Sequence, residues 1–152
     1  MLPIKNQKYI FGRLLKGEFV AYQPLDEDRL VFSDGVRLFV FSKEQIKFDA
    51  TKCACATNLK DVLHDALNGT EVRATEEIRD VGRSNKTYRK LTTNGSSNSV
   101  WVEDKFVKDY GDCILLYNSL YKKKPVCALD DYGDLLAAIM PFDMNAISER
   151  EW

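Results

Sequence analysis

The stretch that most constrains the fold is residues 30–41, in which two apolar runs flank Ser33, Asp34 and Gly35. An Asp-Gly pair between β-branched and aromatic residues favours a tight turn, because glycine adopts a positive φ without steric cost and aspartate can bond its own backbone. The stretch therefore predicts two antiparallel strands joined by a hairpin. We expect this hairpin to lie at the centre of the fold.

Helical patterns occur on both sides of this hairpin. Residues 3–16 predict an amphipathic helix that ends at Gly17. Residues 57–67 carry apolar side chains at i, i+3, i+4, i+7 and i+8, which predicts a second helix with Gly69 as its left-handed stop. A third, shorter helix is expected at 103–110. The remaining strands are expected near residues 18–22, 71–75, 87–92, 100–102, 113–117, 125–129 and 135–140.

A helix followed by three strands occurs twice in this order, at about 3–48 and about 100–144, with an insertion at about 49–99 between the two units. Two such units can join their sheets edge to edge and bury both apolar sides at once. We therefore expect an α+β fold made of one domain, residues 1–152. Its two helix-plus-three-strand units would place the helices on one face of a mostly antiparallel sheet.

Charge gives no bias toward one class of partner for the molecule as a whole, since 22 Lys and Arg stand against 23 Asp and Glu. The first residues lack a signal-peptide pattern, and no apolar run approaches the roughly 20 residues that cross a bilayer. These features predict a cytoplasmic protein with no membrane association. Buried free thiols are expected for the four cysteines, Cys53, Cys55, Cys113 and Cys127.

Catalytic patterns are weak. His64 is the only histidine and lies on a predicted helix without a local nucleophile pattern. Acidic residues cluster at 26–28 and 130–134, where predicted turns favour aspartate for backbone reasons. The sequence contains no metal-ligand spacing, phosphate loop or dinucleotide motif. We therefore expect no enzyme activity, metal or cofactor; the alternative is a small hydrolase that uses the turn carboxylates.

Basic residues gather in the first helix and between residues 78 and 90, where Tyr88 lies among them. Cations with an aromatic ring can contact phosphates and stack a base, although such runs often only face water. The pattern allows weak, non-specific DNA binding, and the alternative is a sequence-specific nucleic-acid-binding regulator. The candidate nucleic-acid-binding residues are Lys5, Lys8, Arg13, Lys16, Arg83, Lys86, Arg89 and Lys90.

Two short motifs resemble the bacterial sliding clamp, the β subunit of the replicative DNA polymerase. Residues 33–38, Ser-Asp-Gly-Val-Arg-Leu, are similar to the clamp's Thr-Asp-Gly-His-Arg-Leu turn. Residues 137–142, Ala-Ala-Ile-Met-Pro-Phe, resemble its final strand, Val-Met-Pro-Met-Arg-Leu. The clamp domain also consists of two helix-and-strand units. The resemblance implies a clamp-like fold and a link to DNA replication or repair, compatible with a phage or mobile-element origin.

In the clamp family these two motifs help form an apolar groove that receives short peptides. The resemblance therefore implies that this chain binds a protein or peptide partner. A homo-oligomer is also implied, because encircling DNA would require several copies of a chain this short. The implied peptide-binding residues are Ser33, Gly35, Val36, Arg37, Leu38, Ala138, Met140 and Phe142. The alternative is that these apolar residues are simply core.

Overall fold

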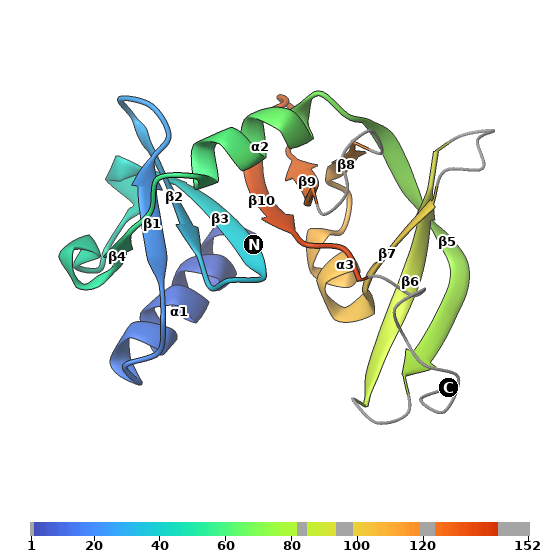
Figure 1. Cartoon of the computed structure of the whole chain (residues 1–152), viewed down its shortest axis with the longest axis horizontal. Helices are drawn as coiled ribbons and strands as arrows, with labels where there is room; N and C mark the ends of the chain where they lie inside the picture. The colour runs from blue at the N-terminus through green and yellow to red at the C-terminus, as the bar shows by residue number, and fades with distance from the viewer. Residues whose placement is uncertain (1, 82–84, 94–98, 119–123, 143–152) are drawn as a thin grey trace.

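Ten strands form one continuous sheet in the computed structural model, which describes residues 2–81, 85–93, 99–118 and 124–142 (Figure 1). The helices are α1 (Leu2–Leu15), α2 (Leu59–Leu67) and α3 (Asp104–Tyr110), with short 3-10 turns η1 (Lys43–Gln45) and η2 (Ala50–Lys52). The strands are β1 (Ala21–Pro24), β2 (Arg29–Ser33), β3 (Arg37–Ser42), β4 (Ala54–Cys55), β5 (Thr70–Val81), β6 (Lys86–Thr92), β7 (Ser99–Glu103), β8 (Ile114–Tyr117), β9 (Val126–Leu129) and β10 (Leu135–Ile139).

The predicted hairpin is confirmed and lies near the middle of the sheet. The strand order is β4-β1-β2-β3-β10-β9-β8-β5-β6-β7, and among these described strands only β4 and β1 run parallel. Within the hairpin, Phe32 lies opposite Phe39. On its other side β3 pairs with β10, where Leu38 lies opposite Ala138. The chain is therefore α+β with a mostly antiparallel sheet, as expected.

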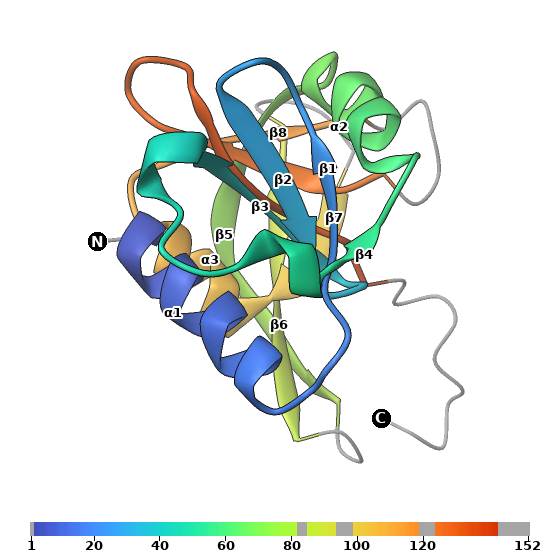
Figure 2. The same cartoon turned by 90° about the vertical axis from the view of Figure 1, so that its left-hand side faces the viewer.

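Helices cover both faces of this sheet, so the expectation of helices on one face is wrong. Phe39 and Phe41 pack with Ile10 of α1, whereas their neighbours Leu38 and Val40 pack with α2. Consecutive residues of a strand point to opposite faces, so α1 and α2 must lie on opposite sides of β3. α3 lies on the α1 side (Figures 1 and 2). A helix is needed on each face because the central strands are apolar on both.

The segment expected as an insertion instead extends the sheet. β5 runs for 12 residues and pairs first with β8 and then with β6. β6 pairs with β7, and a single bridge joins Trp101 of β7 to Phe142, just beyond β10. The strands from β10 round to β7 thus curl about α3, whose Phe106 and Tyr110 lie in the core that they share. No described helix is long and apolar enough to cross a membrane.

Two kinds of glycine position support these elements. Gly17 follows α1, as predicted, with a φ of 72°, and Gly111 follows α3 with a φ of 51°. Gly69 does not have the left-handed conformation that was expected of it. It is needed for a close approach instead, because a Cβ there would lie 2.3 Å from the carbonyl carbon of Tyr117. This contact sets the spacing between the end of α2 and β8.

Candidate functional site

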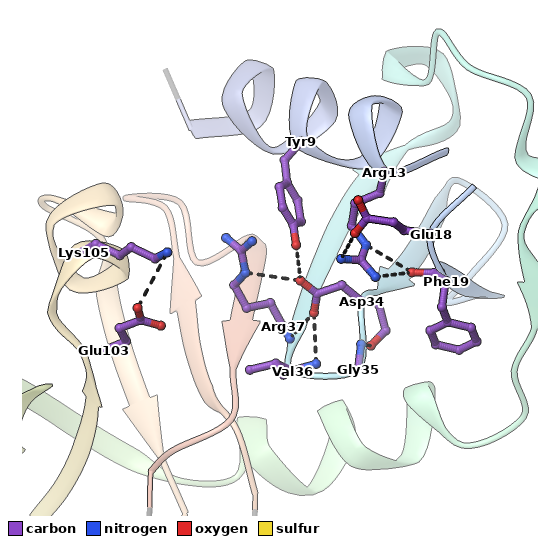
Figure 3. Close-up of polar contacts among 11 residues, drawn as sticks. Tyr9, Arg13, Glu18, Phe19, Asp34, Gly35, Val36, Arg37, Glu103 and Lys105 are labelled. Atoms are coloured by element: carbon purple, nitrogen blue, oxygen red, sulfur yellow. Dashed lines mark hydrogen bonds and ion pairs between the residues drawn. The ribbon is translucent and has the colours of Figure 1, made fainter. Parts of the chain in front are cut away.

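Asp34 organises the turn between β2 and β3 (Figure 3). One carboxylate oxygen accepts the N–H groups of Val36 at 2.9 Å and Arg37 at 2.7 Å. The other accepts the hydroxyl of Tyr9 at 2.7 Å. Burial opposes ionisation of Asp34, but the bonds from Tyr9, Arg37 and Val36 and the Arg37 charge outweigh it, so the pKa of Asp34 lies below its ordinary value. The turn is therefore fixed to α1 through an ionised carboxylate.

Arg37 joins this turn to both helices on the same face. Its guanidinium carbon lies 4.1 Å from the ring centre of Tyr9 on α1 and 4.0 Å from that of Phe106 on α3. Its Nε lies 3.5 Å from Asp34, and the side chain is only 14% exposed. A cation held between two aromatic faces and beside a carboxylate is already satisfied. Arg37 is thus part of the packing between α1 and α3.

The residues expected to form a peptide groove lie close together, but in two different environments. Leu38 and Ala138 are buried under α2 and belong to the core, which is the alternative interpretation considered above. Ser33 is also buried, and its hydroxyl accepts the N–H of Gly35 at 3.0 Å. With Arg37 held between α1 and α3, few members of the set face solvent. Val36 and Gly35 are exposed, and Met140 and Phe142 are half-buried.

The half-buried pair also has internal contacts. The N–H of Met140 donates to the carbonyl of Val36 at 2.9 Å, which continues the pairing of β10 with β3 beyond the strand. Phe142 stacks on Tyr88 with ring centres 4.1 Å apart. The tips of the hairpin and the end of β10 therefore meet as predicted. The surface that Val36, Met140 and Phe142 leave exposed is therefore the side of a packed contact.

A hollow of about 280 Å³ lies elsewhere, on the outer side of α1, where the helix meets the segment after η1. Ile4 and Phe11 provide its apolar wall on α1, and Phe48 provides it on the facing segment. Ile4 is 56% exposed and Phe11 47% exposed, although both are large apolar side chains. Its lining is completed by Gln7, Lys8 and Lys47.

Hydrogen bonds hold the two walls of this hollow in place. Gln7 Nε2 donates to the carbonyl of Gln45 at 2.7 Å, and the N–H of Lys47 donates to Gln7 Oε1 at 2.6 Å. The ring of Phe48 also packs edge-on against Phe32, with ring centres 5.2 Å apart. The hollow is therefore preformed, because Gln7 ties its two walls together and Phe48 is packed against the core.

The apolar surface continues along α1 beyond the hollow. Ile4, Phe11 and Leu15 are spaced i, i+7 and i+11, which places them on one stripe, and Leu15 is 72% exposed. Ile10 and Leu14 use a different face to reach the core. The amphipathic pattern predicted for residues 3–16 does not separate these two faces. The missed signal was that α1 has more apolar residues than a single buried face needs.

The candidate nucleic-acid residues do not form one surface. α1 packs beneath the hairpin, whereas β6 lies near the opposite end of the sheet (Figure 1). Several of the cations are already paired: Lys5 with Asp109, Arg13 with Glu18, Arg89 with Asp104 and Lys90 with Glu77. Lys8, Lys16 and Lys86 form no ion pair within the described part of the chain, and Arg83 lies outside it.

The acidic turns use their carboxylates to shape the backbone. Asp26 accepts the N–H groups of Asp28 and Arg29. Its pKa is lowered, mainly because the Arg29 side chain also donates a hydrogen bond to its carboxylate. Asp130 accepts the N–H groups of Tyr132 and Asp134 at 2.9 Å each. Among the described residues no cluster of three His, Cys, Asp or Glu side chains could hold a metal ion.

The four cysteines are free, but the expectation that all are buried is wrong. Cys53 and Cys127 are buried, Cys113 is half-buried and Cys55 is exposed at the short edge strand β4. Burial raises the pKa of Cys127 to about 12, so this thiol is inert.

No protein-family model matches the chain, and neither a curated protein nor a solved structure matches it.

Proposed function

We propose that the chain is a non-enzymatic binding module that captures a protein segment on the outer face of α1. The observation that carries this proposal is the preformed hollow between Ile4, Phe11 and Phe48. Large exposed apolar side chains that gather around a concavity are typical of interaction sites, whereas single ones are ordinary.

The size of the hollow favours a side chain over a small-molecule ligand. At about 280 Å³ it lies just below the range of about 300–1,000 Å³ that is typical of ligand pockets. Of its polar lining residues, Gln7 already bonds the backbone at Gln45 and Lys47 with both ends of its side-chain amide, and Lys8 and Lys47 are exposed. One bulky apolar side chain of a partner, with neighbouring residues lying along α1, matches both its volume and its lining.

A clamp-like architecture is part of the same proposal, and the strand order supports it. α1 with β1–β3 and α3 with β8–β10 are each a helix followed by three strands, and their third strands pair. The outer strands of both units already have partners, since β5 pairs with β8 and β4 with β1. We therefore propose a clamp-like module of DNA replication or repair that acts as one copy, and sedimentation should give the monomer mass of 17.4 kDa.

Selection from a random peptide library displayed on phage tests the proposed function. The full chain and the variant Phe11→Ser are immobilised separately, and the number of phage that bind each of them is compared. Because Phe11 is half-exposed, this substitution should cost below about 1 kcal/mol of stability, while a truncated hot-spot residue costs about 2 kcal/mol or more in binding. Selected peptides should therefore lose about thirtyfold in affinity on Phe11→Ser.

Ile78→Ser is the matched control, because Ile78 is 49% exposed but lies on β5, away from the hollow. The selected peptides should bind Ile78→Ser as they bind the unchanged chain. If no peptide is enriched, or if enriched peptides bind Phe11→Ser unchanged, the proposed site is wrong.

A further inference from the structure

We infer that the partner segment is acidic and carries one bulky apolar anchor, which enters the hollow on α1. This inference rests on the proposed function and names the chemistry of its ligand. It is carried by the charges around the hollow.

Cations surround the apolar walls. Lys8 and Lys47 line the hollow and are exposed, and Lys43, which is also exposed, lies on η1 four residues before Lys47. None of the three forms an ion pair among the described residues. α1 contains no acidic residue, and the six residues that line the hollow include two lysines and no acid, although Glu44 and Asp49 lie nearby in the facing segment. The local surface is therefore positive, although the whole chain has a net charge of −1.

This contrast favours an acidic partner. Complementary charge around an apolar contact speeds association and fixes orientation, whereas a basic partner would meet uncompensated like charge. The apolar residues of α1 from Ile4 to Leu15 extend over about 16 Å, or three helical turns. A peptide of about twelve residues in a helix has the same length, with its anchor at the Phe11 end of the hollow and acids beside Lys8 and Lys47.

Nucleic acid fits the same surface less well. A phosphate backbone is held by cations, yet Lys5 and Arg13 on α1 are already paired with Asp109 and Glu18. The most exposed apolar side chains of α1 are those of Ile4 and Leu15, which neither neutralise phosphate nor stack a base. An apolar centre with a thin cationic rim is typical of a peptide site.

The test is the composition of the peptides selected on the full chain. Random peptides of about twelve residues, three turns long, are selected on the unchanged chain and separately on Lys8→Glu/Lys47→Glu. Both lysines are exposed surface residues, so the double variant should remain folded, and its thermal unfolding checks this. The pool from the unchanged chain should be enriched in Asp and Glu together with Leu, Phe or Trp.

Affinity measurements then separate charge from apolar contact. A selected peptide should bind Lys8→Glu/Lys47→Glu at least about tenfold more weakly, and raising salt from about 0.05 M to about 0.5 M should remove most of that difference. Lys16→Glu is the matched charge control, because Lys16 is exposed beyond the end of α1 and does not line the hollow.

Each result decides a different claim. Peptides that depend on Phe11 but show no acidic enrichment and bind the double lysine variant equally would overturn the acidic partner while leaving the proposed function intact. Absence of any Phe11-dependent peptide would overturn both. A short DNA duplex that displaces selected peptides at about 0.15 M salt would assign the surface to nucleic acid instead.

Discussion

The two regions that border α1 differ in how their exposed chemistry is used. On its inner side, the helix meets the β2–β3 turn, where Asp34, Arg37 and Tyr9 satisfy one another. On its outer side, Ile4 and Phe11 line an open hollow, and the two lysines that line it with them form no ion pair with any described residue. The inner region contains the motif that resembles the clamp's turn, but its side chains contact one another. The outer region has the exposed apolar and lysine side chains. Burial and pairing, rather than motif likeness, distinguish a packing site from a binding surface.

The largest effect on stability is expected for Arg37→Ala. The substitution leaves the Asp34 carboxylate without its cation and removes the contact that joins α1 to α3. Breaking such a buried pair should cost about 3–5 kcal/mol in urea unfolding. Arg73→Ala is the control, since Arg73 is 79% exposed in its pair with Glu71, and its cost should stay below about 1 kcal/mol. If both variants lost equally little unfolding free energy, Arg37 would not be a packing residue and would again be a candidate for peptide binding.

Leu38→Ala tests whether Leu38, at the centre of the sheet, is a core residue or part of a peptide groove. Leu38 is buried under α2 opposite Ala138, so its truncation should cost about 2–5 kcal/mol. Val36→Ala, two residues away and exposed, should change the unfolding free energy by below about 0.5 kcal/mol. Chemical denaturation of both variants provides the comparison. A Leu38 variant as stable as the Val36 variant would mean that this part of the sheet is not packed as described.

Acid sensitivity should also distinguish the inner region. The folded-state pKa of Asp34 lies below the unfolded-state value, which is about 3.9. The stabilisation is therefore present above the unfolded-state pKa and is lost as pH falls through the folded-state pKa. Unfolding free energy measured from about pH 6 down to about pH 2 should fall less steeply for Asp34→Asn than for the unchanged chain. Parallel curves would mean that Asp34 is not held in its ionised form.

The smallest effect is a gain in stability within α1. Gly12 lies inside the helix, and a Cβ there would meet nothing within 4 Å. Gly12→Ala should therefore stabilise the chain by about 0.5–1 kcal/mol and raise the melting temperature by a few degrees. A loss of stability would mean that residue 12 is not the open helical position that the structure describes.

Local sequence signals predicted the elements well, because their causes are local. The Asp-Gly turn and the glycines that end α1 and α3 all have the conformations that their chemistry favours. Placement of the helices on both faces was not predicted. The run Leu38-Phe39-Val40-Phe41 has no polar residue, a pattern typical of strands buried on both sides, and it was the available signal. β5 was underestimated because its exposed end has no apolar alternation.

The hollow could not be predicted from the sequence because its walls come from distant segments. Phe48 reaches it only because Gln7 bonds the backbone at Gln45 and Lys47. Ile4 and Phe11 looked like members of the buried face of α1, since helical periodicity does not say which of two apolar stripes meets the core.

Chemical-shift mapping of the labelled full chain with a selected peptide tests the central claim most directly. We predict that the largest changes in backbone amide shifts will lie along residues 4–15 and at Lys47 and Phe48, which border the hollow. Small changes are expected at Val36 and Met140. The largest changes at Val36, Met140 and Phe142, with α1 unaffected, would contradict the account and place binding at the junction of β3 and β10.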